Sequence, residues 1–436
     1  MSQELKNVAT EMFLRALEDC SIERAFSRAV RVDAGRLVVN GDVIVALDTI
    51  TRVRVIAVGK AAVPMLDALL RTVELPSGDV RGVLIAPKRP EHVPEDFAFF
   101  AGGHPSPNEA SFAGARAALE LMRAAAKEPE RTLCLFLVSG GGSSMMELPL
   151  DKRISLEDTV AFHRALVGSG ASIVEMNCVR KHFSAVKGGR LAMAAGAAQK
   201  LSVFVSDVPP HTLDALASGP TIADTTTRDE CRGIIRRYGM EARFPASVRE
   251  FFASDIPETP KPGEVGSPAH VLLSSAELGA AARRAAEGMG FPVVTDNTCD
   301  DWPYDRAAEY LLERLRELRR ERGRVCVISC GEVTVTLPAS LPENAHGGRN
   351  QQWALHVATR LRAEDAPIAV LSGGSDGIDG NSPAAGAVVD ETTADPEAEE
   401  TLPTFSAYEY LRTRGAVLMT GATGQNLRDL RILLAE

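Results

Sequence analysis

The stretch TLCLFLVSGGGSSMMELP, residues 132–149, decides the fold class of this chain. Residues 133–138 form an unbroken apolar run of strand length, and a cluster of glycines and serines ends the run abruptly. A short apolar run bounded in this way is typical of a strand that is buried on both faces, as in a parallel sheet covered by helices. The stretch therefore predicts an α/β fold.

The loop that follows this strand has almost no side-chain bulk. It consists of Ser139, Gly140, Gly141, Gly142, Ser143 and Ser144. Backbone N–H groups of such a loop can approach an anion closely, which is typical of phosphate sites, although three glycines can equally form a tight turn under a packed helix. The chain contains no G-x-G-x-x-G, and its Gly59-Lys60 pair is followed by Ala61, so it has no Walker A motif either.

The composition limits the partners and the location of the protein. The chain has 436 residues, 45% of them hydrophobic, and a net charge of −10. This length favours two domains or three. The acidic excess argues against a nucleic-acid partner, whereas a small anionic substrate needs only a local positive pocket. Because no apolar run approaches the ~20 residues of a membrane span and residues 1–20 lack signal-peptide character, we expect a cytoplasmic protein with no membrane partner.

The cysteines agree with that location. There are seven of them, an odd number without a C-x-x-C spacing, and two lie within apolar strand-like runs. This pattern predicts buried free thiols in a reducing compartment.

Three polar residues of the first half stand at the ends of predicted strands or in rigid turns. Lys60 follows the apolar run 53–58, and Asp207 follows the run 201–205. Ligands of open parallel sheets bind at the carboxyl ends of strands, so both are candidates for phosphate or metal chemistry, with a solvated lysine and an ordinary turn aspartate as the alternatives. His104 is held extended by Pro105, and a plain loop histidine is the favoured interpretation.

A cluster of cations lies between the runs. Arg180, Lys181, Lys187 and Arg190 surround a glycine pair within residues 171–195. Charges of one sign in a helical stretch usually form a solvated face, which is what we expect here, with contact to an anion as the alternative.

The second half repeats the α/β pattern. Prolines and glycines between residues 256 and 268 predict a linker. Beyond it, the run 325–329 is predicted to be a strand that ends near Glu332, and residues 333–337 a second strand. Arg349 and Asn350 open a predicted helix, where the helix dipole disfavours a cation, so an anion that shares this helix end would explain the arginine.

A second glycine loop follows the predicted strand 368–371. Residues 372–380, SGGSDGIDG, contain Gly373 and Gly374 and add the carboxylate of Asp376. Two strand-to-glycine loops in two domains are what a kinase cleft needs. The closing segment, from residue 417 onwards, is expected to complete a sheet.

Together these motifs carry a resemblance to a known family. SGGGSS, VRKHFSAVKGGRLA, SDVPP with LASGPTIAD, GEVTVT with HGGRNQQ, and GGSDGIDGNSPAAGAVVD occur in this order over nearly the whole chain. The sequence resembles the glycerate 2-kinases of the MOFRL family, formerly often labelled hydroxypyruvate reductases. The resemblance implies an N-terminal Rossmann-like domain (1–255, with 415–436 as a possible completion), the linker 256–268, and a smaller C-terminal MOFRL domain (269–414), with the active site in the cleft between them.

The resemblance also implies an activity and a set of site residues. The activity is ATP-dependent phosphorylation of the 2-hydroxyl of D-glycerate, which gives 2-phosphoglycerate and ADP and uses Mg²⁺. Lys60, Arg349, Asp207 and Asp376 match the active-site positions, and the glycine loops, including Gly373 and Gly374, would bind phosphates. Asp207 and Asp376 remain for Mg²⁺ and for the hydroxyl proton, with the division between them open.

His104, Asn350 and Glu332 are expected near the substrate, and the assembly is expected to be a monomer or a homodimer. Because neither Lys60 nor Arg349 belongs to an apolar run, replacing either is expected to leave the fold intact.

Some positions depart from the family pattern and keep alternatives open. They include His211, Thr212, Gln352, Ser382 and Pro383. A kinase for a related short sugar acid is one alternative. A hydroxypyruvate reductase is another, against which the missing dinucleotide motif counts. A non-enzymatic sensor of a sugar acid is the third.

Overall fold

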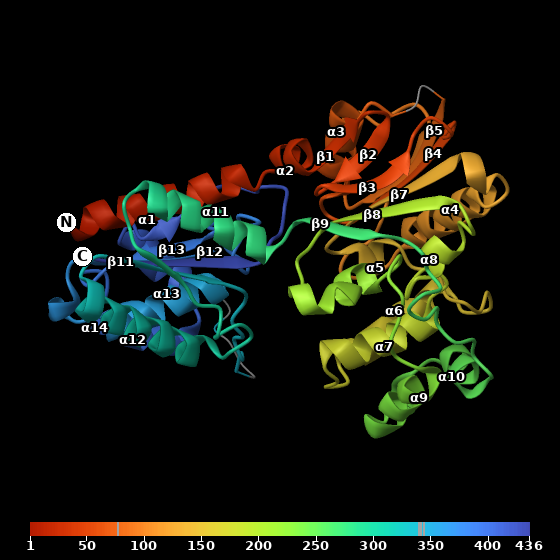
Figure 1. Cartoon of the computed structure of the whole chain (residues 1–436). Coiled ribbons are helices and arrows are strands. Elements are labelled where there is room, and N and C mark those ends of the chain that lie inside the picture. Colours follow the sequence, from red (N-terminus) through yellow and green to blue (C-terminus); the bar gives the residue numbers. More distant parts are fainter. Residues whose placement is uncertain (76–77, 339–341, 343–344) are drawn as a thin grey trace. The chain divides into compact units, whose positions relative to one another are not determined.

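The structure is a computed structural model of the chain, and it describes residues 1–75, 78–338, 342 and 345–436. The chain divides into two compact units (Figure 1). The N-terminal unit comprises Ile22–Leu272, and the C-terminal unit comprises Met1–Ser21 together with Leu273–Glu436. Each unit contains its own six-stranded sheet.

The sheet of the N-terminal unit is doubly wound. Its strand order is β6-β5-β4-β7-β8-β9, and the strands are β4 (Arg52–Val58), β5 (Asp79–Ala86), β6 (Phe97–Ala101), β7 (Thr132–Ser139), β8 (Gln199–Val205) and β9 (Ala269–Leu273). The pairs β4 with β5, β5 with β6, β4 with β7, and β7 with β8 are all parallel. The chain therefore reverses its direction of growth between β4 and β7, and the predicted Rossmann-like sheet is confirmed. At such a switch point the two following loops diverge and leave room for a ligand.

Helices cover the faces of this sheet because its strands are apolar on both sides. All eight residues of β7 are buried. Figure 1 shows α3 on one side of the sheet and α4 and α8 on the other. The helices of this part of the unit are α3 (Ala62–Thr72), α4 (Glu109–Ala125), α5 (Gly142–Met145) and α8 (Arg190–Met193), and α2 (Ile22–Ala29) packs on α3. Short antiparallel strands add a separate three-stranded sheet, β1 (Val30–Asp33), β2 (Arg36–Val39) and β3 (Asp42–Ala46).

Four further helices form a lobe of this unit around an aromatic cluster. They are α6 (Leu156–Val167), α7 (Ile173–Phe183), α9 (Arg228–Arg237) and α10 (Ala246–Ala253). Side chains cap three of them at Ser155, Ser172 and Thr227, as the Ser/Thr-x-x-acid spacing requires. The lobe packs on stacked rings, among them Phe162 and Phe183 with centroids 4.2 Å apart.

The sheet of the C-terminal unit is mixed. Its order is β10-β11-β15-β12-β13-β14, and the strands are β10 (Val293–Thr295), β11 (Val325–Cys330), β12 (Ile368–Gly374), β13 (Gly386–Val389), β14 (Val417–Leu418) and β15 (Asp429–Ala435). In Figure 1, α1 and α11 lie on one face and α12 and α13 on the other. The helices are α1 (Ser2–Asp19), α11 (Ser275–Gly288), α12 (Tyr304–Arg322), α13 (Arg349–Arg360), α14 (Pro396–Thr401) and α15 (Ala407–Thr413).

The structure divides the chain differently from the expected domains. Residues 415–436 do not complete the N-terminal sheet, because β15 lies between β11 and β12 and is antiparallel to both. All seven residues of β15 are buried, so this apolar strand takes a central place in its own sheet. Residues 1–21 also belong to the C-terminal unit, since α1 buries Ala9, Met12 and Phe13.

The expected linker is not free. Residues 256–268 are irregular in backbone but belong to the N-terminal unit. Ile256 and Val265 are buried, Thr259 donates to Asp224 Oδ2 at 3.0 Å, and Ser202 N–H donates to the carbonyl of Pro268 at 2.8 Å. The prolines thus shape a coil that is packed onto the unit.

The strand expected at 333–337 does not form. Within it, the structure gives one isolated bridge, between Thr334 and Pro303. Both edges of β11 are already paired, with β10 and β15, so the chain that leaves β11 has no free edge to join.

Two other expectations concern the chain as a whole. All seven cysteines are free and buried, as predicted. Among the described residues, no helix is both long and apolar enough to cross a bilayer.

Candidate active site

The loops after β4 and β7 meet at the switch point of the N-terminal sheet. Lys60 N–H donates to the carbonyl of Gly140 at 2.9 Å, and Ala61 N–H donates to Ser139 Oγ at 3.0 Å. Gly59 has a φ of +118°, and a Cβ at this position would overlap Ser139. Glycine is required here because the two loops approach each other backbone to backbone.

Asp207 and Lys60 both lie beside the glycine loop. A Cβ on Gly140 would overlap the carboxylate of Asp207, and a Cβ on Gly141 would lie 3.3 Å from Lys60 Cγ. The sequence-predicted Lys60, Asp207 and the loop 139–144 are therefore brought together at one edge of the sheet. This edge carries a cation, a carboxylate and the glycine backbone.

His104 joins the same edge. Its Nδ1 lies 3.2 Å from Ser144 Oγ. Burial, with a smaller contribution from the charge of Lys60, lowers the pKa of His104, so its imidazole is neutral at pH 7. The plain loop histidine favoured from the sequence is wrong in this respect, because the ring contacts the glycine loop.

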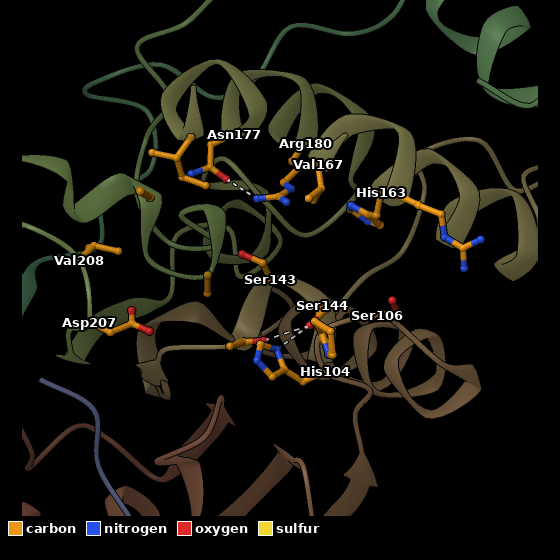
Figure 2. Close-up of a pocket in the computed structure, with 16 residues that line it drawn as sticks. His104, Ser106, Ser143, Ser144, His163, Val167, Asn177, Arg180, Asp207 and Val208 are labelled. Atoms are coloured by element: carbon orange, nitrogen blue, oxygen red, sulfur yellow. Dashed lines mark hydrogen bonds between the residues drawn. The ribbon is translucent and has the colours of Figure 1, made fainter. Parts of the chain in front are cut away.

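His104, Asp207 and part of the glycine loop line a pocket of about 490 Å³. Figure 2 shows Asn177 and Arg180 on one side of it and His104 and Ser144 on the other. The further lining residues are Pro105, Ser106, Gly141, Ser143, His163, Arg164, Val167, Ile173, Asp207, Val208, Ala215 and Ala217.

The motif LASGP contributes Ala217 to the pocket lining, and VKGGRLA supports it from behind. Ala217 and Ser218 both have positive φ, 50° and 58°, a strained backbone that is common at functional sites. Ser218 Oγ lies 2.9 Å from Ser143 Oγ, which ties the strained turn to the glycine loop. Gly188 N–H donates to the carbonyl of Ser218 at 3.1 Å, so the glycine pair serves as support for this turn.

The cation cluster of residues 171–195 is not a solvated face. Lys181 and Lys187 are only 2% and 1% exposed. Lys181 donates to Asp214 Oδ2 at 2.6 Å, and Lys187 forms an ion pair with the fully buried Glu147. A run of like charges forms a solvated face only when the fold offers no buried carboxylates to pair with it. Here Asp214 and Glu147 supply such carboxylates from distant parts of the chain.

Burial and charge compete at Glu147. Burial alone would raise its pKa, but the positive charge of Lys187 and the hydrogen bond with His163 outweigh it and lower the pKa to about 2. His163 Nε2 lies 2.9 Å from Glu147 Oε2. Burial lowers the pKa of His163, so the charge of Glu147 is matched by Lys187.

In the C-terminal unit, Arg349 lies between two carboxylates. Arg349 is the first residue of α13, and it donates to Asp429 Oδ2 at 2.6 Å and pairs with Glu332 Oε1 at 2.7 Å. Burial lowers the pKa of this guanidinium, but Asp429 and Glu332 outweigh burial and raise it. Burial and the charge of Asp429 raise the pKa of Glu332. The sequence did not indicate Asp429, which lies three residues before the apolar run 432–435.

The start of α13 is occupied by a carboxylate of the chain itself. Asp379 accepts the backbone N–H groups of Asn350 and Gln351 at 3.1 and 2.8 Å. Burial raises the pKa of Asp379 to about 7 even though these bonds oppose it. The carboxyl group of Asp379 therefore occupies the helix end at which an anion was inferred. Arg349 instead pairs with Glu332 and Asp429. Asn350 is buried and accepts from Ser372 Oγ at 2.6 Å.

The second glycine loop lies next to these groups. Asp376 Oδ1 accepts the N–H of Ile378 at 3.1 Å, and a Cβ on Gly374 would lie 3.2 Å from the same oxygen. Gly373 packs directly on the ring of Phe13, where a Cβ would come within 2.9 Å. Arg349 also lines a pocket of about 370 Å³ with Gly347, Gly348, Gln352 and Asn381 among its neighbours.

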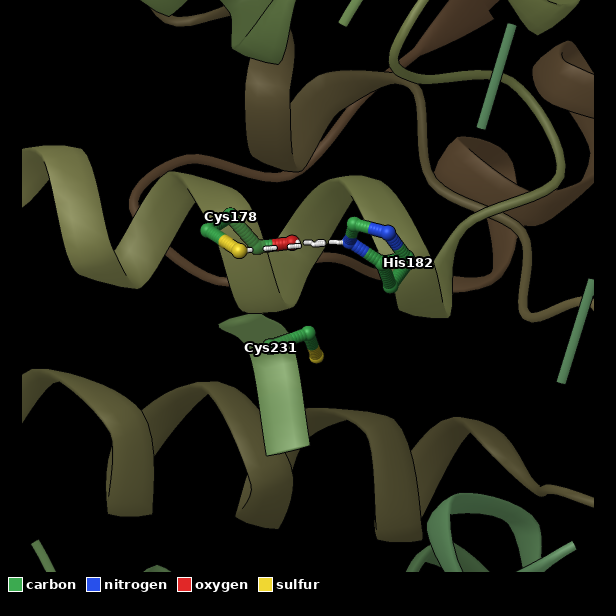
Figure 3. Close-up of side chains that lie close together, drawn as sticks. All are labelled: Cys178, His182 and Cys231. Atoms are coloured by element: carbon green, nitrogen blue, oxygen red, sulfur yellow. Dashed lines mark hydrogen bonds between the residues drawn. The ribbon is translucent and has the colours of Figure 1, made fainter. Parts of the chain in front are cut away.

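A cluster with metal-ligand composition lies away from both glycine loops. Cys178 and His182 on α7 and Cys231 on α9 are all buried and converge (Figure 3). His182 Nδ1 lies 2.8 Å from the carbonyl of Cys178, and Nε2 lies 3.0 Å from Glu258 Oε1. A carbonyl can only accept, so Nδ1 carries a proton and cannot ligate an ion in this arrangement. Burial lowers the pKa of His182, but Cys178 and Glu258 outweigh burial and raise it. The cluster thus ties α7 to α9 and to the coil 256–268.

Comparison with known proteins agrees with this geometry. Residues 8–253 match the family described as a domain of unknown function, DUF4147, and residues 325–429 match the MOFRL family. The D-glycerate 2-kinase of Thermotoga maritima is 33% identical over 442 residues, covering 99% of this chain and 98% of that protein. The glycerate 2-kinase of Pyrococcus horikoshii is 31% identical and covers 100% of this chain and 98% of its own. The crystal structure of a glycerate kinase from T. maritima, 31% identical, superposes over 100% of both chains with a TM-score of 0.84. With both domains matched and relatives aligned over its full length, the chain belongs to the MOFRL family of glycerate 2-kinases.

Proposed function

We propose that this chain is an ATP-dependent kinase that phosphorylates the 2-hydroxyl of D-glycerate, giving 2-phosphoglycerate and ADP. The observation that carries the proposal is that Lys60, the glycine loop and Asp207 meet at the switch point of the N-terminal sheet, beside a pocket that the loop and Asp207 line. Family membership supplies the reaction class. The relatives are named glycerate 2-kinases, and we infer the same activity for this chain.

Catalysis of phosphoryl transfer depends mainly on aligning the attacking hydroxyl and on neutralising the charge of the transferred group. Lys60 supplies a compact positive charge beside the backbone N–H groups of the glycine loop. Arg349, at the second glycine loop, supplies a planar guanidinium.

The carboxylates of the two glycine loops fit a magnesium ion. Mg²⁺ prefers oxygen ligands and is usually held by one or two carboxylates together with substrate phosphates. Asp207 abuts the first glycine loop and Asp376 the second, so each stands where a phosphate would be cradled. When bound, the ion neutralises phosphate charge. The carboxylate that does not hold the ion accepts the proton of the attacking hydroxyl.

The pocket also favours a second candidate, a kinase for a longer hydroxy acid. Its volume of about 490 Å³ falls within the range of roughly 300–1,000 Å³ that holds drug-sized ligands, which is more than a three-carbon acid fills. Val208 lines this pocket, and His211 and Thr212, which depart from the family pattern, follow it within four residues.

The test is ADP release by the purified full-length chain with ATP, Mg²⁺ and a panel of short 2-hydroxy acids. We expect turnover with D-glycerate, and turnover with a four-carbon or five-carbon acid would favour the second candidate. In parallel, hydroxypyruvate and NADH are supplied without ATP. Steady NADH oxidation there, with no ADP release in the first assay, would contradict the kinase proposal.

A further inference from the structure

Arg180 differs from the buried cations Lys181 and Lys187, which both pair with carboxylates. Its Nη1 donates to Asn177 Oδ1 at 3.2 Å, and its Nε is buried without a hydrogen-bond acceptor. Among the described residues, no carboxylate lies within ion-pair distance of this guanidinium. Burial therefore lowers the pKa of Arg180, and the more distant charge of Glu147 only partly opposes this.

Glu147, Asp214 and Asp224 are already paired with cations other than Arg180. Glu147 is bound by Lys187 and by a His163 whose lowered pKa makes it neutral. Lys181 is matched by Asp214 and Asp224. A buried charge without a counter-ion is costly, and a protein keeps such an arrangement where a ligand supplies the missing charge.

The guanidinium is held in place for a ligand. Asn177 Oδ1 accepts from Arg180 and also from Ser218 Oγ, at 3.2 Å in each case. Ser218 in turn contacts Ser143 of the glycine loop at 2.9 Å. Two side chains, those of Asn177 and Ser218, therefore connect the guanidinium to the loop where a phosphate would bind, and Arg180 and Ser143 both line the same pocket (Figure 2).

Resting on the proposed function, we infer that Arg180 binds the carboxylate of the hydroxy-acid substrate in the pocket lined by Asn177, Ser143 and His104. The fork of a guanidinium matches a carboxylate in two parallel hydrogen bonds, and this geometry sets the direction of the acid. The carbon that bears the 2-hydroxyl is bonded directly to the carboxylate carbon. Anchoring the carboxylate therefore brings that hydroxyl to the side of the pocket that holds His104 and the glycine loop.

Arg349 is less suited to the same task. It is already neutralised by Glu332 and Asp429. A substrate carboxylate there would meet two like charges, whereas at Arg180 it meets none within ion-pair distance among the described residues.

The test compares Arg180→Met with the full-length parent in steady-state kinetics. We expect the KM for D-glycerate to rise roughly 10- to 100-fold, as the loss of a charge-assisted pair of hydrogen bonds predicts, while the KM for ATP stays within about threefold. Arg180→Lys should recover only part of the loss, because it keeps the charge without the fork. The matched control is Arg236→Met, which removes an exposed guanidinium from α9 in the same lobe and should leave both constants unchanged.

A thermal melt separates binding from a structural role. Arg180→Met removes a buried charge that lacks a counter-ion, so its Tm should equal or exceed that of the parent. Added D-glycerate should raise the Tm of the parent and not that of Arg180→Met.

The outcomes are distinguishable. If the parent phosphorylates no hydroxy acid, the proposed function fails. If the parent is active and Arg180→Met keeps its KM for D-glycerate, this inference is wrong although the kinase proposal stands. A rise in the KM for ATP alone would assign the pocket to nucleotide phosphates and overturn the inference as well.

Discussion

At the scale of single residues, Lys60 and Arg349 carry the same expected role in very different surroundings. Lys60 is exposed. We expect Lys60→Ala to keep the parent Tm and to lose kcat by roughly 10² or more, because charge neutralisation is a large part of phosphoryl transfer. Lys60→Arg should recover little, since a planar fork cannot replace a point charge in a narrow turn. A parent-like kcat in Lys60→Ala would show that the lysine is a surface residue.

Arg349→Ala should lower the stability of the protein as well as its activity. This differs from the expectation from sequence that the replacement leaves the fold intact. Its side chain is 36% exposed, but it separates Glu332 from the buried Asp429. Without it, two carboxylates face each other, so we expect a loss of about 1–3 kcal/mol of stability, less than for a fully buried pair. The deficit in Tm should shrink as the pH falls, because the pKa of Glu332 is already raised and its protonation removes the repulsion. A pH-independent deficit would contradict this account.

The buried pair Glu147 and Lys187 gives a prediction about acid stability. The pKa of Glu147 is lowered to about 2 from 4.5, so its contribution to stability is present above pH 4.5 and is lost as the pH falls toward 2. A shift of this size corresponds to about 3 kcal/mol. Lys187→Met should therefore lower the Tm strongly at pH 7, whereas Glu147→Gln with Lys187→Met should recover much of it. The double variant should also lose less Tm than the parent between pH 4.5 and 2.

At the scale of elements, sequence predicted best where a local pattern and the tertiary structure agree. The apolar run of β7 ending in glycines predicted a buried parallel strand because no other element satisfies both its faces. The same run could not show that β4 is its neighbour. That pairing is what brings Lys60 to the glycine loop.

Elements whose partners lie far away in the chain were placed wrongly or missed. The residues of β15 form a strand in either domain, and only its pairing with β11 and β12 decides the assignment. The burial of Lys181 and Lys187 depends on Asp224 and Glu147, each about 40 positions away. Arg180 looked like one more solvated cation because the pocket that it lines is built from distant parts of the chain. Long-range charge pairing leaves no local pattern in the sequence, so the burial of Lys181 and Lys187 could not be predicted from spacing.

At the scale of the whole molecule, the first helix of the chain completes the last sheet. α1 packs on the face of the C-terminal sheet, its Phe13 lies against Gly373, Ser2 donates to Glu391 at 2.7 Å, and Lys6 pairs with Asp390 at 2.9 Å. Residues 273–436 alone would keep α11 on that face but would leave uncovered the part under α1, at β12 and β13, and the buried side of the second glycine loop. Exposing several large side chains, each worth about 1.5–3 kcal/mol, is enough to unfold a domain of this size.

We therefore predict that a fragment of residues 273–436 is unfolded or aggregated, while residues 22–272 melt cooperatively by themselves. Figure 1 shows the two chain ends near each other in the C-terminal unit, so a flexible linker can join Glu436 to Met1. The rearranged chain 273–436, linker, 1–21 should recover a cooperative melt followed by circular dichroism. A version of it with Phe13→Asp is the matched control and should remain unfolded, because it keeps the length and the linker but buries a charge against Gly373. A cooperative melt of residues 273–436 without α1 would show that the helix is an accessory and not part of the core.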